Sequence, residues 1–500
     1  MSKRINREPN VIQLRFELGL RIGALIVGLY HMLMSLYRCY GGFSGSIFEH
    51  MDFVLFGVLV LATASYLVFT KMEYPDTMYR VRDFMHRLFC PEMLVLMALF
   101  CWYVISCIAC GSYYHGTWLK GNAFPLLDTA INVFIFFPLA AYMPENRRRQ
   151  AIHGVIHIIV SLMTVLMVFV LWNVYHLNII RLPGGEIGMT ADVRLTVCVH
   201  PNTVAAYVSL FMMLCLYMIL IQPMPAKLLY GFALFIHLVV LILTNSRTCF
   251  IAITASFMLC SAVYTWHRSK SSSSLKCAVL CVLASSLVFA FFLLARKLVF
   301  QSFQSITHFS ELVALQNGAS SAQAAASSAN SASHITLKAD SMSSRYITWL
   351  YSLKAMVYDL HKAVFGVTPI SVDSVLDLIA GGDHADVYTH NQFLEVGVCL
   401  GFPGLILFIV YIVLIARNCL NVGLSKEQMP YPGYYVMPAT IFMLVISNLT
   451  EGRLMFYHYQ PAAFFFILGG WITLESRNLP NLFQRKPSPA CTKAGKKKTP

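Results

Sequence analysis

Segments of about twenty mostly apolar residues recur along the chain, and they constrain its fold more than any other feature. About 20 such residues cross roughly 30 Å of hydrocarbon as a helix. Backbone polar groups in lipid must pair within their own segment, and no run alternates as barrel strands do. The sequence therefore predicts an all-α, polytopic membrane bundle of about twelve helices, at residues 18–37, 53–70, 91–110, 122–143, 152–175, 203–221, 226–244, 249–266, 275–296, 392–416, 434–450 and 455–475.

Composition supports the same class. The chain has 500 residues, of which 57% are hydrophobic and only 12% are charged. Soluble globular domains carry about 25% charged residues, so this chain has too little polar surface to face water on all sides. Composition therefore excludes an ordinary soluble domain.

The distribution of Lys and Arg predicts the orientation, because cytoplasmic loops retain an excess of positive charge. About two thirds of the 37 Lys and Arg fall on one side if the N-terminus is inside. We therefore expect both termini to be cytoplasmic. The net charge of +14 includes a basic C-terminal tail, for which anionic lipid headgroups are a nearer partner than nucleic acid. We expect no nucleic-acid binding.

A long polar segment divides the predicted spans into groups of nine and three. Its low-complexity part is too poor in apolar side chains to form a packed core and is expected to be a flexible linker. After this linker, apolar residues from Tyr346 to Val364 recur at helical spacing, which predicts an amphipathic helix on the outer surface. The predicted parts are a cytoplasmic N-terminal segment 1–17, spans within 18–296, an exterior loop 297–390 with linker 317–334, spans within 391–475, and a basic tail 476–500.

Chemically active side chains gather at the predicted exterior ends of the spans. Arg247 lies in a very short turn between two spans, Arg345 opens the amphipathic helix, and His390 precedes the tenth span. Each has a simpler interpretation: an arginine can extend to lipid phosphates, a surface arginine can be solvated, and a histidine can anchor at the interface. Asn391 and Glu395 are one helical turn apart, so we expect both to point into one cavity. Further candidates on the same side are His200, Asn202, Glu451 and Arg453.

These residues resemble the bacterial O-antigen ligase and polymerase superfamily. The resemblance covers roughly residues 190–475. It rests on the runs Asn245–Thr248, Ser344–Arg345 with Trp349 and Phe365–Gly366, Thr389–Glu395, Gly401–Gly404, His200–Asn202 and Glu451. Two positions depart from the pattern, because Thr248 and Val367–Thr368 stand where the family often has glycine. The low-complexity insert is also foreign to the family.

The resemblance implies metal-independent transfer or polymerisation of a glycan in cell-surface polysaccharide biosynthesis. The donor would be a saccharide on a polyprenyl diphosphate such as undecaprenyl diphosphate, at the outer face of the bacterial cytoplasmic membrane. The acceptor would be a hydroxyl on a lipid, glycan or protein. Arg247 and Arg345 would hold the diphosphate, since a guanidinium group can donate two parallel hydrogen bonds to phosphate oxygens. His390 would be the general base, kept neutral by the nearby arginines.

The other candidates would orient the base or bind sugar: Asn391, Glu395, His200, Asn202, Glu451 and Arg453. No Asp-x-Asp pair marks a divalent metal site, and no cofactor is expected. The alternative function is a twelve-helix secondary transporter or a flippase for lipid-linked glycans. A transporter usually carries charges near the membrane midplane and repeats that relate its halves, whereas charges near the middle of the predicted spans are nearly absent here, apart from Arg21. Sugar, acceptor, carrier length and oligomeric state are open at this stage.

Overall fold

The computed structural model is described here for part of the chain. The described residues are 89–111, 118–142, 145–176, 179–182, 185–189, 194–197, 199–269, 274–307, 340–381, 389–425, 432–449, 452, 454–456 and 460–479, with isolated residues between 19 and 62. The predicted spans 18–37 and 53–70, the linker 317–334 and most of the two terminal segments lie outside this part.

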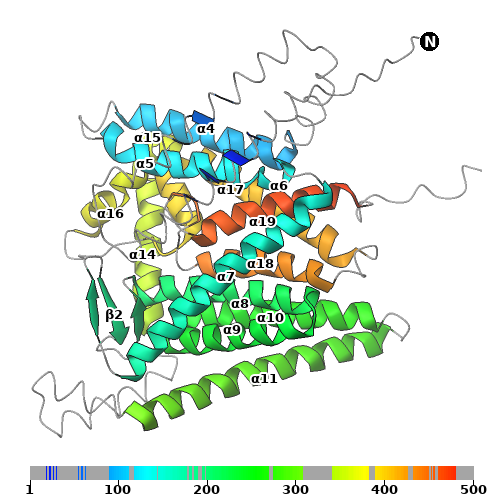
Figure 1. Cartoon of the computed structure of the whole chain (residues 1–500). Coiled ribbons are helices and arrows are strands. Elements are labelled where there is room, and N and C mark those ends of the chain that lie inside the picture. The colour runs from blue at the N-terminus through cyan, green and yellow to red at the C-terminus, as the bar shows by residue number, and fades with distance from the viewer. Residues whose placement is uncertain are drawn as a thin grey trace, which may run out of the picture.

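Long apolar helices form the body of the molecule and lie roughly side by side across Figure 1. Eight of those described are long and apolar enough to cross a membrane, which supports a polytopic, mostly helical protein. They correspond to predicted spans between residues 91 and 424. They are α4 (Pro91–Gly111), α5 (Trp118–Ile131) continued by η3 (Asn132–Phe136) and α6 (Leu139–Tyr142), α7 (Glu145–Tyr175), α8 (Pro201–Ile221), α9 (Met224–Leu243), α10 (Arg247–Arg268), α11 (Ser274–Thr307) and α17 (Gln392–Leu424).

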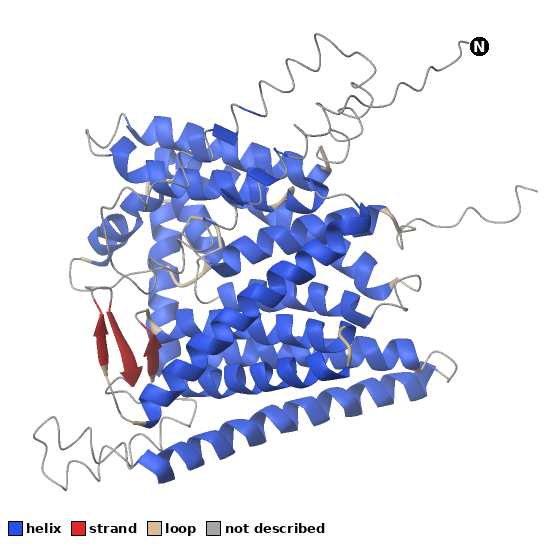
Figure 2. Cartoon of the chain, in the orientation of Figure 1, coloured by secondary structure: helices blue, strands red, loops and turns tan. Residues whose placement is uncertain are grey.

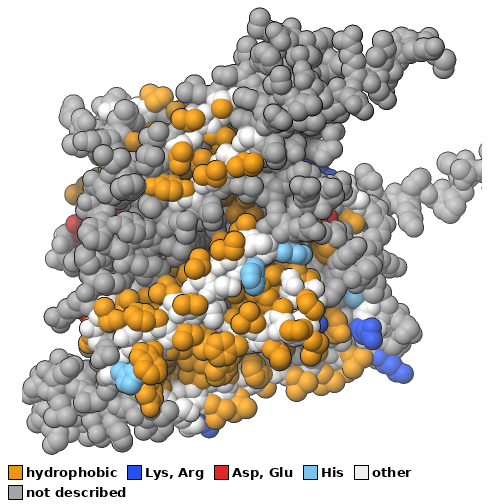
Figure 3. Space-filling model, in the orientation of Figure 1, with side chains coloured by type: hydrophobic (Ala, Val, Ile, Leu, Met, Phe, Trp, Pro, Cys, Tyr) orange, Lys and Arg blue, Asp and Glu red, His pale blue; other side chains and the backbone are white. Residues whose placement is uncertain are grey.

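Burial differs sharply between these helices. Of these eight helices α8 is the most buried: 78% of the residues in its most apolar stretch are buried, compared with 11% for α11. Leu275, Leu283 and Leu287 of α11 are more than half exposed, and apolar side chains cover much of the lower surface in Figure 3. Such a surface is stable only against lipid, because a soluble monomer rarely exposes large contiguous apolar patches. The chain is therefore a multi-pass membrane protein.

A small antiparallel sheet, which the sequence pattern did not predict, lies at one end of the bundle (Figure 2). Its strands are β1 (Ile180–Leu182), β2 (Gly185–Met189) and β3 (Leu195–Val197). β1 pairs with β2 through Ile180 and Ile187, and β2 pairs with β3 through Ile187 and Val197. Strands of three to five residues give too short an alternation to recognise in a sequence. We call this end of the bundle the sheet end.

The opposite end carries basic residues. Lys227, Arg268 and Lys276 lie at the ends of α9, α10 and α11 that point away from the sheet, and most of the Lys and Arg surface visible in Figure 3 is there. We call this the basic end. Whether one face carries an excess of positive charge stays a prediction, because the sheet end also carries arginines.

The segment after α11 returns to the sheet end as three short helices, α14 (Asp340–Met356), α15 (Leu360–Phe365) and α16 (Val372–Ala380), with η4 (Pro369–Ser371) between the last two. α14 runs nearly at right angles to the long helices in Figure 1. The sequence predicted one amphipathic helix to Val364, and this was wrong. Asp359 accepts a hydrogen bond from the backbone N–H of Lys362 and so starts a second helix, as short acidic side chains do at helix N-termini.

α17 is broken near the sheet end, as the run Gly401–Gly404 predicted. Gly401 has non-helical backbone angles, and Pro403 has no N–H to donate to Cys399 O. The freed carbonyls are paired by the preceding segment instead: Val367 N–H donates to Val398 O at 2.9 Å and Thr368 N–H to Cys399 O at 3.0 Å. The break in α17 is therefore where the 340–380 segment is held.

α4 completes this attachment. The indole N–H of Trp102 donates to Leu400 O at 2.9 Å, and its ring stacks on Phe365 with centroids 5.6 Å apart. The last helices are shorter than predicted: η5 (Pro432–Tyr435) leads into α18 (Val436–Asn448), and α19 comprises Gln460–Arg477. The predicted total of twelve spans is not tested by the described part.

Candidate functional site

The turn between α9 and α10 is the centre of the candidate site. α9 ends at Leu243, Asn245 has a φ of 51°, and α10 begins at Arg247. Asparagine tolerates this left-handed conformation better than most residues, which allows so short a connection. The side chain of Ser246 provides no cap for α10. We call residues Thr244 to Thr248 the arginine turn.

Arg345 reaches the arginine turn from α14. Its Nη1 lies 3.4 Å from the hydroxyl of Thr248. Arg345 and Thr248 are 97 residues apart in sequence, yet the contact places Arg345 beside the residue that follows Arg247. The structure thus brings two of the three predicted catalytic residues to the same turn. Both side chains are half-buried.

Two further arginines lie at this turn and were missed by the sequence analysis. Arg194 donates from Nε to Thr244 O at 3.1 Å and from Nη2 to Asn202 Oδ1 at 2.6 Å. Arg296 of α11 donates to Asn245 Oδ1 at 3.2 Å and is close enough to Arg247 for their charges to interact. Neither lies in a recognisable motif. Arg296 could have been noticed as a charge at the end of an apolar span.

His200 and Asn202 lie at the start of α8. His200 is exposed, and its Nδ1 accepts a hydrogen bond from the backbone N–H of Asn202 at 3.3 Å, so it caps α8. Asn202 is buried and joins Arg194 to α8. The thiol of Cys249, at the start of α10, contacts Asn202 O at 3.8 Å. Asn202 therefore lies next to the arginine turn, and its contacts there are structural.

The start of α17 carries the other predicted residues. Asn391 caps the helix by accepting hydrogen bonds from the backbone N–H groups of Phe393 at 2.9 Å and Leu394 at 3.2 Å. His390, directly before it, is half-buried and has a φ of 48°. A non-glycine residue in this conformation is strained by about 1–3 kcal/mol, and such strain often occurs at functional positions.

Asn391 and Glu395 differ in their surroundings. Asn391 lines a cavity with α14, whereas Glu395 is fully buried and is not among the residues that line this cavity. A Cβ at Gly452 would lie 2.6 Å from Glu395 Oε2 and 3.3 Å from the backbone of Asn391, so Gly452 packs on both residues. That both residues point into one cavity stays a prediction.

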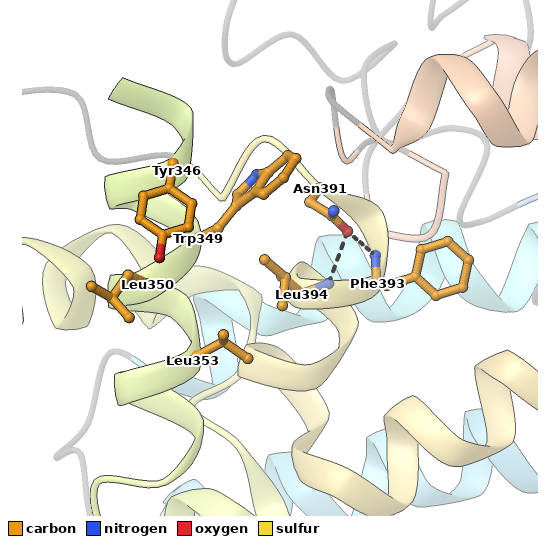
Figure 4. A pocket seen from close by; sticks show the side chains of 7 residues that line it. All are labelled: Tyr346, Trp349, Leu350, Leu353, Asn391, Phe393 and Leu394. Atoms are coloured by element: carbon orange, nitrogen blue, oxygen red, sulfur yellow. Dashed lines mark hydrogen bonds between the residues drawn. The ribbon is translucent and has the colours of Figure 1, made fainter. Parts of the chain in front are cut away.

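A cavity of about 450 Å³ lies between α14 and the start of α17 (Figure 4). It is lined by Tyr346, Trp349, Leu350, Leu353, Asn391, Phe393 and Leu394. Figure 4 shows Trp349 and Asn391 on facing sides of the space. Tyr346 follows Arg345 and Asn391 follows His390 in the chain. The arginines and His390 are not among the lining residues. Arg345 belongs to α14, which forms one side of the cavity, and His390 lies just before α17, which forms the other side.

Glu451 and Arg453 lie outside the described residues, although Gly452 between them packs on the start of α17. Among the side chains that the structure describes, no group of three or more His, Cys, Asp or Glu could hold a metal ion. The arginine turn itself offers guanidinium groups and the N-terminus of α10, which suit an anion.

One comparison with known proteins finds a family. Residues 232–409 match the family model described as O-Antigen ligase, and no curated protein matches the chain. The matched part contains the arginine turn, α14 and the start of α17, and it excludes His200, Asn202, Glu451 and Arg453. Such a domain implies ligation or polymerisation of glycans at a membrane. Residues 232–409 are therefore similar to an O-antigen ligase domain, and this similarity supports the superfamily predicted from the sequence.

Proposed function

We propose that the chain transfers a glycan from a polyprenyl diphosphate to a hydroxyl acceptor at the sheet end of the bundle. The observation that carries the proposal is the contact of Arg345 with Thr248, because it joins a guanidinium group from the 340–380 segment to the turn that holds Arg247. Two guanidinium groups beside a helix N-terminus offer paired N–H donors and positive charge. A diphosphate is an anion of matching charge and shape.

The transfer breaks the bond between the anomeric carbon of the donor sugar and a diphosphate oxygen. The electron pair goes to that oxygen, the acceptor hydroxyl oxygen bonds to the anomeric carbon, and the hydroxyl proton is removed. Arg247 and Arg345 would stabilise the leaving diphosphate, so that no metal ion is needed for that role. We assign proton removal to His390, which lies at the start of α17 beside the cavity residue Asn391.

The remaining predicted residues differ in their support. Asn391 lines the cavity and is proposed to contact the acceptor or the donor sugar. For Asn202, His200 and Glu395, burial and capping contacts favour a role in positioning the site rather than in touching substrate. Glu451 and Arg453 are kept as proposed substrate contacts on the basis of the resemblance alone.

We further propose that the protein resides in the bacterial cytoplasmic membrane with both termini cytoplasmic. In this orientation the basic end faces the cytoplasm, in agreement with the retention of positive charge on that side. The arginine turn and the cavity then open toward the outer face, where a translocated lipid-linked glycan would be presented.

The test is transfer of a labelled glycan from a lipid-linked donor by purified protein in proteoliposomes containing EDTA. Arg247→Lys and Arg345→Lys keep the charge but lose the paired geometry, and each should lower the rate by about 10-fold or more. The matched control is Arg268→Lys, which lies exposed at the other end of α10 and should leave the rate unchanged. His390→Ala should abolish transfer.

Three outcomes would refute parts of this proposal. Normal transfer by His390→Ala would remove its role as base, and loss of activity in EDTA that zinc or magnesium restores would refute metal independence. Movement of donor across the bilayer without transfer would favour a flippase. In cells, deletion of the gene distinguishes a polymerase from a ligase. Single lipid-linked repeat units accumulate if the protein is a polymerase, and full-length unattached glycans accumulate if it is a ligase.

A further inference from the structure

Arg296 is a charged residue within the long apolar span Leu275–Phe303 of α11. Ionisable residues in membrane-spanning segments are costly and usually have a function. An arginine near the end of a span can also extend to the lipid headgroups. The contacts of Arg296 decide between these two roles.

The side chain of Arg296 points to the protein. Its Nη2 donates to Asn245 Oδ1 at 3.2 Å, and its guanidinium carbon lies 5.3 Å from the centre of the Phe250 ring. Both partners belong to the arginine turn and the first turn of α10. The next residue, Lys297, is exposed. α11 thus holds the Arg296 side chain against the start of α10, while the side chain of Lys297 faces away from the protein.

The place to which Arg296 points already contains positive charge. Arg247 is close enough to interact electrostatically with it, and Arg345 lies on Thr248. Like charges this close repel each other, and partial burial strengthens the repulsion because the local dielectric constant is lower than in water. A bound anion of two or more charges converts this repulsion into attraction. Asn245 and Phe250 keep Arg296 in place while the anion is absent.

We propose that Arg296 is a third guanidinium group of the donor site and binds the diphosphate together with Arg247 and Arg345. This inference rests on the proposed function. When the bond to the sugar breaks, the diphosphate gains one negative charge, so a third cation stabilises the products and the transition state more than it stabilises the bound donor. A diphosphate also carries more negative charge than a monophosphate, so a third guanidinium group makes the site selective for a diphosphate.

Phosphate groups at this depth come from two sources, the donor and the phospholipid headgroups. The test measures binding of farnesyl diphosphate and farnesyl monophosphate to purified protein in phosphatidylcholine nanodiscs. Arg296→Gln should weaken diphosphate binding by about 10-fold or more and monophosphate binding by far less. Arg296→Lys should restore part of the difference. Lys297→Gln removes the same charge one residue further along α11 and should change neither affinity.

The outcomes separate this inference from the proposed function. Absence of diphosphate binding by the unchanged protein would refute the proposed donor site itself. Diphosphate binding that is equal in the unchanged protein and Arg296→Gln would refute only the role of Arg296. Equal loss for both ligands would indicate that Arg296 merely supports the turn. Native mass spectrometry in nanodiscs with phosphatidylglycerol tests the second source of phosphate. If Arg296→Gln loses bound phosphatidylglycerol while its diphosphate affinity is unchanged, Arg296 binds a lipid headgroup and not the donor.

Discussion

Replacement of Gly366 by alanine tests how the 340–380 segment is attached to α17. Gly366 has a φ of 72°, and an added Cβ would lie 2.5 Å from Leu400 N and closer still to the carbonyl group of Cys399. These neighbours are backbone atoms that cannot rotate away. The segment must therefore move off the broken part of α17.

The cost can be worked out from the contacts that this movement removes. Alanine in a backbone conformation reserved for glycine costs about 1–3 kcal/mol. Separation also stretches the hydrogen bonds from Val367 and Thr368 to α17, and each buried carbonyl left without a donor costs about 1–3 kcal/mol. We expect Gly366→Ala to lower the free energy of unfolding by about 3–9 kcal/mol.

The matched control is Gly381→Ala. Gly381 also has a positive φ, 87°, but nothing lies within 4 Å of an added Cβ. It should cost only the backbone term of about 1–2 kcal/mol. Denaturant unfolding of the purified protein in detergent measures both free energies. If Gly366→Ala is no more destabilising than Gly381→Ala, the close approach of the segment to α17 does not exist.

Three further predictions concern single contacts. Trp102→Phe leaves the carbonyl of Leu400 without its indole donor and should destabilise the protein by about 1–3 kcal/mol in the same unfolding assay. Partial burial of Asp359 opposes ionisation, but hydrogen bonds from Lys362 prevail and lower the pKa of Asp359. Because its pKa is lower in the folded state than in the unfolded state, its stabilising effect is complete above the unfolded value and is lost as the pH falls through the folded value. Asp359→Ala should therefore cost about 1 kcal/mol at pH 7 and little at strongly acid pH, as unfolding at both pH values will show; an equal cost at both would contradict this. Arg194→Lys removes the paired hydrogen bonds between the start of α8 and the arginine turn, so glycan transfer should fall by about 10-fold with the protein still folded; unchanged transfer would contradict the positioning role.

The sequence predicted those parts of the protein that depend on local composition. A run of apolar residues long enough to cross a bilayer forms a helix whatever surrounds it, because lipid offers its backbone no other partner. For the same reason the helices between residues 91 and 424 agree with the predicted spans. The break in α17 was also predictable, since Gly401 and Pro403 act on their own backbone. The start of α15 could have been predicted from Asp359, because aspartate is a common N-cap residue.

The tertiary structure decided which polar side chains meet. Arg296 and Arg194 belong to no motif, and they become part of the candidate site only because α11 and the residue before β3 lie against the arginine turn. Glu395 is fully buried, and Gly452, which lies 57 positions further along the chain, packs on its carboxyl group. Contacts between segments far apart in sequence depend on how helices pack, and apolar spans of similar composition can pack in many ways. The sequence alone determined a membrane bundle with a part, residues 232–409, that is similar to an O-antigen ligase domain, and the packing of its helices placed four arginines at one short turn.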